Sequence, residues 1–148
     1  MKVADIMTKN VITCEADTKV SDIAKKLIKH DITGMPVVKG KEVIGIVTEA
    51  DLIMQRAKIH IPAYIQLLDS FLYLEDPKAV EEELRKILGL TAQDVMTEDV
   101  ITIGPEDSVE DLATLIEKEH INPIPVIEDK TLVGIVSRAD IVRLLARD

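Results

Sequence analysis

The sequence predicts an α/β fold made of two copies of one small unit, packed together and joined by a helical connector. The first observation is an internal repeat: residues 5–53 align without a gap to residues 94–142, and 19 of the 49 paired positions are identical. The second is that each copy alternates β-branched segments with apolar residues at helical spacing. The third is size, because a unit of about 50 residues is marginally stable alone. We therefore expect the two copies to bury their apolar faces against each other.

Each copy begins with a predicted strand followed by a helix. The segments 11–13 and 100–102 both read Val-Ile-Thr, a β-branched run typical of a strand. Apolar residues at helical spacing then run from 20 to 28 in the first copy. In the second copy Asp107 precedes Glu110 by three residues, a variant of the capping box, which predicts a helix start at 107–108.

A predicted hairpin and a second helix complete the copy. The strand Pro36-Val37-Val38 leads through a turn at 39–41 into an apolar strand at 43–47. Thr48, and Ser137 in the second copy, stand where the last helix begins. The order is therefore strand–helix–strand–strand–helix in both copies.

The sequence of the connector predicts two further helices. Pro62 suits the first turn of a helix, and residues 65–74 are apolar on nearly every side, so that segment is expected to be buried in the core or against another subunit. A second helix is predicted over 78–88, ended by Gly89. The predicted organisation is thus 1–57 for the first copy, 58–92 for the connector and 93–148 for the second copy.

Composition excludes several classes of function. The formal net charge of −9 argues against binding to nucleic acid or to an anionic membrane face. Aromatic residues make up 2% of the chain, so base-stacking platforms are not expected. A single cysteine, Cys14, fits a reducing compartment, and the sequence shows neither a signal peptide nor an apolar run long enough to cross a bilayer. We expect a cytoplasmic protein.

Three motifs, each present twice in the same order, carry a resemblance to a known family. They are Asp-hydrophobic-Met-Thr at 5–8 and 94–97, Pro-Val at 36–37 and 125–126, and Gly-hydrophobic-hydrophobic-Ser/Thr-x-x-Asp at 45–51 and 134–140. The chain resembles a pair of CBS domains, a Bateman module, of the stand-alone type. The resemblance implies two β-α-β-β-α units related by a pseudo-twofold axis, a homodimer, and clefts that bind adenosine-containing ligands.

The second half of the last motif makes physical sense as a nucleotide site. A helix N-terminus presents free N–H groups and the positive end of its dipole to phosphate. The hydroxyl of Thr48 or Ser137 is placed to donate to a phosphate oxygen, and the carboxylate of Asp51 or Asp140 to accept ribose hydroxyls. The resemblance assigns the same residues to phosphate and ribose. The alternative is that each pair only caps its helix.

The two copies differ beside these pairs. Arg138 follows Ser137, whereas Glu49 follows Thr48. Since a cation holds a phosphate and a carboxylate opposes it, the sequence predicts that Ser137, Arg138 and Asp140 form the better phosphate site. The alternative is that Glu49 and Arg138 are solvated surface charges.

Adenine is expected in an aliphatic slot, with backbone groups near the Pro-Val strand reading its edge. The alternative is that these side chains belong to the core. The candidate residues are Ile12, Thr13, Gly34, Met35, Pro36, Val37, Ile101, Thr102, Asn122, Ile124, Pro125 and Val126.

The resulting prediction is a non-enzymatic sensor with no catalytic residues. AMP, ADP or ATP is the expected ligand, with S-adenosylmethionine or NAD possible, and no tightly bound metal is expected. Ligand binding would change the conformation read by an effector protein. The alternatives are a ligand-free dimerisation scaffold and a Mg²⁺ sensor served by the acidic stretch 94–111. The histidines occupy no shared repeat position and are assigned to the surface or the connector.

Overall fold

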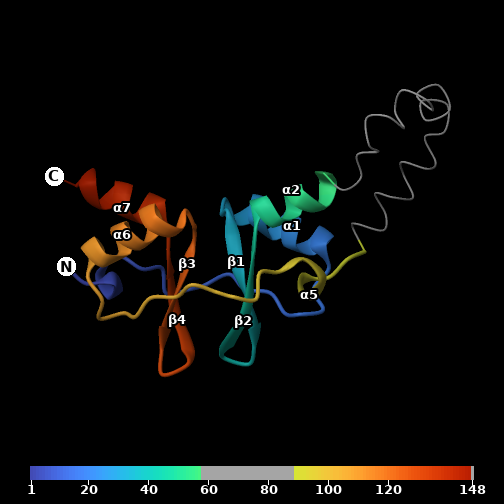
Figure 1. Cartoon of the computed structure of the whole chain (residues 1–148), viewed down its shortest axis with the longest axis horizontal. Helices are drawn as coiled ribbons and strands as arrows, with labels where there is room; N and C mark the ends of the chain where they lie inside the picture. Colours follow the sequence, from blue (N-terminus) through green and yellow to red (C-terminus); the bar gives the residue numbers. More distant parts are fainter. Residues whose placement is uncertain (58–88, 148) are drawn as a thin grey trace.

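The computed structural model describes residues 1–57 and 89–147 and holds two α/β units side by side (Figure 1). The predicted connector helices lie outside the described residues. Along the chain the elements are η1 (Val3–Asp5), α1 (Val20–His30), β1 (Gly34–Lys39), β2 (Glu42–Thr48), α2 (Glu49–Ala57), α5 (Ala92–Val95), α6 (Val109–Glu119), β3 (Ile124–Glu128), β4 (Thr131–Val136) and α7 (Arg138–Leu145).

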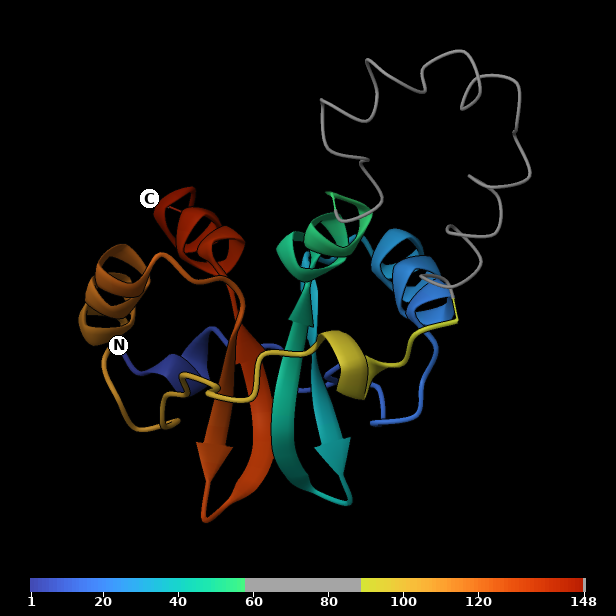
Figure 2. The same ribbon diagram turned by 45° about the vertical axis from the view of Figure 1, so that its right-hand side comes forward.

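The predicted repeat is confirmed element by element. Helix α6 is the equivalent of α1 at an offset of 89 residues, and α7 is the equivalent of α2. The hairpins recur at the same offset. Figure 2 shows the two hairpins side by side with their turns pointing one way; the helices α1, α2, α6 and α7 lie toward the other end, and α5 lies beside the strands. Within the described ranges, no helix is long and apolar enough to cross a membrane.

The hairpins follow the predicted turns. The strands β1 and β2 pair antiparallel and turn at Gly40, whose φ of +66° is in the left-handed region that glycine adopts without strain. The strands β3 and β4 pair in the same way, and there Asp129 and Lys130 take φ values of 49° and 65°. Both hairpins carry a bulge in the second strand, where Ile44 and Val133 are the extra residues of the register.

The predicted strands at 11–13 and 100–102 are wrong. In the first copy only Cys14 joins the sheet: its N–H donates to Pro36 O (3.1 Å) and its carbonyl accepts from Val38 N (2.9 Å). Extending this parallel ladder by one step toward Ile12 requires an N–H at position 36, and proline has none. Ile103 makes the same single bridge, and Pro125 stops it in the same way.

The helix starts at 48–49 and 137–138 are confirmed, but the predicted cap of α6 is displaced by one residue. Ser108 is the N-cap, and its Oγ accepts from Asp111 N at 3.0 Å. Asp107 instead accepts the N–H of Gly104 at 2.8 Å and closes the turn that precedes the helix.

The segments that begin the two copies are exchanged. We call residues 1–10 arm 1 and residues 90–99 arm 2. Arm 1 lies on the second unit, where Thr8 and Ile135 exchange two backbone hydrogen bonds of 2.9 and 3.0 Å. Arm 2 lies on the first unit, where Thr97 and Ile46 do the same at 2.9 and 3.0 Å. Each folded unit therefore contains the arm of the other copy.

The residues of the Asp-hydrophobic-Met-Thr motif either shape the arm or hold it on the other unit. The Asp94 carboxylate accepts the N–H and hydroxyl of Thr91 at 2.8 and 3.0 Å, and these bonds hold its pKa below its ordinary value. Met96 lies over Gly45, and in arm 1 Met7 lies over Gly134. The threonine then makes the bridge to the sheet.

Two separate apolar cores result, and each includes residues from an exchanged arm. Ala92 and Val95 of arm 2 join the core of the first unit, and Val3 of arm 1, which is 0% exposed, joins that of the second. Among the described residues no polar or charged side chain is buried in either core. The arms are thus fixed by apolar burial as well as by backbone hydrogen bonds.

Alanine at position 134 should loosen arm 1. Its Cβ would lie 2.5 Å from Met7 Sδ and 2.9 Å from Met7 Cγ, so the methionine must move. We expect Gly134→Ala to lower the free energy of unfolding by about 1–3 kcal/mol. In a Met7→Ala background the same substitution should cost less, because the clashing side chain is gone and only the 3.2 Å contact with Thr8 O remains. Urea unfolding of the four proteins measures this, and equal costs in both backgrounds would contradict the packing described.

Cys14 should make stability fall at alkaline pH. Burial raises the pKa of its thiol from 9.0 to about 11. The unfolded chain therefore loses this proton first, so the contribution is constant below pH 9 and is lost as pH rises from about 9 to about 11. We expect the difference in unfolding free energy between the wild type and Cys14→Ala to shrink by at most about 1 kcal/mol per pH unit across that window. A pH-independent difference in urea unfolding would contradict it.

Candidate functional site

Two pockets lie where the units meet, and they are lined by equivalent residues. Pocket A, of about 390 Å³, surrounds the start of α2, and pocket B, of about 190 Å³, surrounds the start of α7. In pocket A the lining comes from Thr48, Asp51, Thr97, Ile101 and Ile121; in pocket B the corresponding positions are Ser137, Asp140, Thr8, Ile12 and Ile32. Each pocket therefore combines a helix start, an exchanged arm and a loop of the opposite unit.

At each helix start a hydroxyl and a carboxylate form one hydrogen-bonded pair. Asp51 Oδ2 accepts from Thr48 N at 2.9 Å and from Thr48 Oγ1 at 3.1 Å. Asp140 Oδ2 accepts from Ser137 N at 2.7 Å and from Ser137 Oγ at 3.2 Å. Both pairs cap their helices, so the structure contains the arrangement that the capping alternative requires, and both border a pocket.

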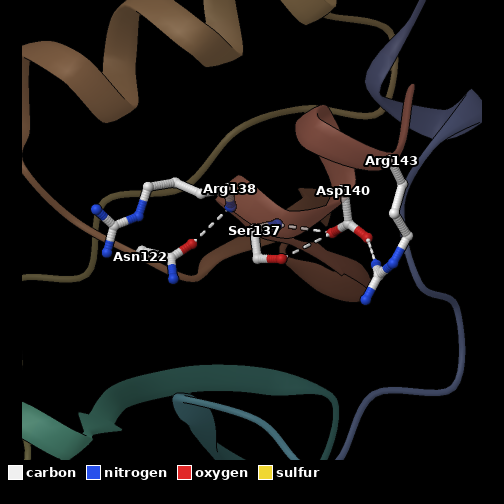
Figure 3. Close-up of polar contacts among 5 residues, drawn as sticks. All are labelled: Asn122, Ser137, Arg138, Asp140 and Arg143. Atoms are coloured by element: carbon white, nitrogen blue, oxygen red, sulfur yellow. Dashed lines mark hydrogen bonds and ion pairs between the residues drawn. The ribbon is translucent and has the colours of Figure 1, made fainter. Parts of the chain in front are cut away.

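The second carboxylate oxygen distinguishes the two pockets. Asp51 Oδ1 accepts a hydrogen bond from Thr97 Oγ1 of arm 2 at 3.3 Å. Asp140 Oδ1 instead pairs with Arg143, whose guanidinium lies 2.8 Å away, as Figure 3 shows. The Asp140 side chain is 10% exposed and that of Arg143 is 70% exposed, so an arginine at the edge of the solvent balances the charge of the carboxylate of pocket B.

The wall shared by both pockets lies on the pseudo-twofold axis. Thr33, Asn122 and Pro123 line both pockets. Asn122 Nδ2 donates to Thr33 Oγ1 at 3.3 Å, and these two residues are 89 positions apart. Equivalent positions of two copies touch only where the axis relating them passes. The expected pseudo-twofold arrangement is therefore visible in this contact.

The two helix starts are tied to this wall by different groups. Glu49 N donates to the backbone carbonyl of Thr33 at 2.8 Å. Arg138 N donates to the side-chain Oδ1 of Asn122, also at 2.8 Å. The start of α7 is therefore held by a side chain, in the position where α2 is held by the main chain.

Arg138 does not lie where the sequence analysis placed it. Its side chain lines pocket A, the pocket of Thr48 and Asp51, and not pocket B beside Ser137 and Asp140. In Figure 3 the Arg138 side chain extends on the side of Asn122, away from Asp140. The reason is that residue 138 begins the first turn of α7, so it projects from a different side of the helix than residue 140. Position in the motif did not indicate which pocket it borders.

The predicted adenine residues divide into three groups. Ile12, Gly34 and Asn122 line pocket B, and Ile101 and Asn122 line pocket A. Thr13 and Thr102 line neither pocket. The remaining candidates are buried in the two cores, as the core alternative states, and their side chains do not reach a pocket: Met35, Pro36, Val37, Ile124, Pro125 and Val126.

Several pocket residues escaped the sequence analysis. Thr8 and Thr97 come from the exchanged arms, and their place in a pocket follows only once the exchange is known. His120 was assigned to the surface or the connector; it is exposed and lines pocket A. Among the residues that the structure describes, no group of three or more His, Cys, Asp or Glu side chains is placed to hold a metal ion.

Comparison with known proteins gives one consistent family. A sequence model of the CBS domain matches residues 3–58 and 92–147. The uncharacterized protein MJ1426 of Methanocaldococcus jannaschii is 31% identical over 98% of this chain and 91% of its own length. The chain spans only 23% and 24% of two further relatives, which are named as enzymes.

Two solved structures share the fold over nearly the whole chain. The CBS domain of a CBS-domain-containing membrane protein from Sphaerobacter thermophilus is 35% identical, with a TM-score of 0.71 over 97% of this chain and 87% of that one. The CBS domain pair of protein MJ0100, solved with 5′-methylthioadenosine and S-adenosyl-L-methionine, is 28% identical, with a TM-score of 0.71 over 99% and 97%.

Asn122 should contribute more to stability through its helix bond than through its bond to Thr33. We expect Asn122→Ala to lower the unfolding free energy by about 1–2 kcal/mol, because Arg138 N loses its acceptor. Thr33→Val removes only a bond between partly exposed groups and should cost under about 1 kcal/mol. Urea unfolding compares the two variants, and a larger loss in Thr33→Val would contradict this assignment.

Proposed function

The chain belongs to the CBS domain family, and from this premise we propose that it is a regulatory module that binds an adenosine-containing ligand between its two units. The observation that carries the proposal is that one kind of pocket occurs twice, each time with a helix start, a hydroxyl–carboxylate pair, an exchanged arm and the isoleucine that follows the arm. A capping role accounts for the hydrogen bonds between the hydroxyl and the carboxylate. It does not account for the position of each pair beside a cavity formed with the opposite unit.

The lining of pocket A suits the three parts of a nucleotide. The Asp51 carboxylate keeps lone pairs available beyond its bonds to Thr48 and Thr97, so it can accept from ribose hydroxyls. Ile101 and Ile121 offer an apolar surface to the flat base. The first turn of α2 attracts an anionic group through its dipole. Pocket B offers the same elements around Asp140.

AMP, ADP and ATP, together with S-adenosylmethionine and NAD, are the ligands that share this adenosine moiety. The CBS pair of MJ0100, which was solved with two adenosine compounds, supports the moiety as the feature recognised. A ligand held between units favours one relative placement of them, and it shifts that equilibrium only by its differential affinity for the two placements. We propose that an effector protein senses this change, without chemical turnover of the ligand.

The organisation proposed for this role is a homodimer in the cytoplasm. Residues 1–57 and 93–148 form the two CBS motifs, with 58–92 as connector. Because the arms are exchanged, ligand binding at either pocket engages both motifs at once.

Thermal unfolding with separate additions of AMP, ADP, ATP, S-adenosylmethionine, NAD and Mg²⁺ tests the proposal. A ligand at 100 times its Kd adds about 2.7 kcal/mol of apparent stability, which raises the midpoint measurably. We expect at least one adenosine compound to do so, on protein shown by absorbance to carry no bound nucleotide. A shift with Mg²⁺ alone would favour the cation sensor, and no shift with any compound would favour the scaffold.

Asp51→Asn and Asp140→Asn assign the shift to a pocket. Each variant is compared with its own unliganded midpoint, because the loss of a capping carboxylate itself costs about 0.5–2 kcal/mol. Asp94→Asn is the matched control: Asp94 accepts the N–H of Thr91 in the same geometry but lines neither pocket. We expect the ligand shift to survive in Asp94→Asn and to shrink in one or both of the others. An equal shift in all three would contradict binding at these pockets.

A further inference from the structure

We propose that Arg138 recognises the anionic group of a ligand held in pocket A, although its own helix start borders pocket B. This inference rests on the proposed function and specifies the charge of the ligand that each pocket binds. Pocket A takes an adenosine compound with a single anionic group, and pocket B takes none with a net negative charge.

The placement of Arg138 supports this role. It lines pocket A but not pocket B, and its backbone is anchored by the 2.8 Å bond to Asn122 on the shared wall. Among the described residues its guanidinium makes no ion pair or hydrogen bond, and it is the lone Lys or Arg of the pocket A lining. All its donors are therefore available to a carboxylate or phosphate.

The two pockets differ in how their charges are arranged. In pocket B the cation and the carboxylate neutralise each other, because Arg143 is paired with Asp140. In pocket A Asp51 pairs with hydroxyls and N–H groups, and Arg138 approaches from the opposite unit. An acceptor for ribose hydroxyls and a separate cation for an anion are present together only in pocket A.

The remaining charges of pocket A limit the anion to one group. Glu49 and Asp99 also line it, and both are exposed. Each carboxylate repels an additional phosphate, with an energy reduced by solvent screening. One cation among three carboxylates therefore favours a monophosphate, or the single carboxylate of S-adenosylmethionine, over a triphosphate.

Binding of AMP and of adenosine, measured by calorimetry on the full chain, separates the inference from the proposed function. In Arg138→Gln we expect the Kd for AMP to rise about tenfold or more, from loss of a charge-assisted contact, and the Kd for adenosine to change less than about twofold. Arg147→Gln, which removes the same charge from a residue outside both pockets, should leave both values unchanged. The effect of Arg138→Gln on the Kd for S-adenosylmethionine shows whether a carboxylate can take the place of the phosphate. In the wild type, the Kd for ATP should be higher than the Kd for AMP.

A methyl signal in each pocket locates the anion. Ala50 and Ala139 are equivalent and line pocket A and pocket B respectively, so their methyl NMR signals report the two pockets. In the wild type, AMP should shift the Ala50 methyl more than the Ala139 methyl. In Arg138→Gln the same concentration of AMP should shift the Ala50 methyl less than in the wild type.

Three results would overturn the inference. One is an equal loss of AMP and adenosine binding in Arg138→Gln. Another is a larger loss of AMP binding in Arg143→Gln than in Arg138→Gln, which would make Arg143 the anion-binding residue. The third is an AMP shift in the wild type that appears at the Ala139 methyl and not at the Ala50 methyl. Binding of adenosine with no effect of Arg138 leaves the proposed function standing, whereas binding of none of the adenosine compounds tested overturns both.

Discussion

The exchange of the two arms is the constraint on which both pockets depend. Thr97 bonds to Ile46 and Thr8 to Ile135, each through two main-chain hydrogen bonds, and each methionine lies over a glycine of the strand it crosses. These contacts carry the following segments, with Ile101 and Ile12, to the helix start of the other copy. Because of the exchange, the threonine hydroxyl and the isoleucine that line each pocket belong to the opposite copy from its helix start.

The hydroxyl–carboxylate pairs serve the fold and the pockets with the same atoms. A helix N-terminus leaves N–H groups without intrahelical partners, and Asp51 and Asp140 satisfy one each. Each carboxylate still has lone pairs for a second partner, and the structure shows two solutions: a threonine hydroxyl at Asp51 and an arginine at Asp140. The capping and binding interpretations are thus compatible, because a capping carboxylate keeps lone pairs free for a further partner.

The sequence predicted the parts of the fold that local pattern determines. The repeat offset of 89, the apolar spacing of α1 and α6, and the turn at Gly40 were predicted from the sequence pattern and are present in the structure. The strand at 11–13 was a wrong prediction, although Pro36 carries the reason: a β-branched run cannot pair where its partner strand lacks an N–H. The exchange could not be predicted, because residues aligned at one offset fit either copy equally well. The pocket of Arg138 depends on that exchange and on the direction of its side chain, so motif position alone misplaced it.

The position of the pockets gives ligand binding a route to a structural change. The described contacts between the units include few polar ones near the axis: the Asn122–Thr33 bond and the backbone bond from Leu132 N to Lys41 O, 3.0 Å long. A ligand in pocket A touches α2 and arm 2 on one side and Asn122, His120 and Arg138 on the other. Its binding energy is therefore distributed over both units and depends on their relative placement. Since Asn122 lines both pockets and also holds the start of α7, the ligand proposed for pocket A would contact a residue of the pocket B lining, and any resulting change in affinity would be reciprocal.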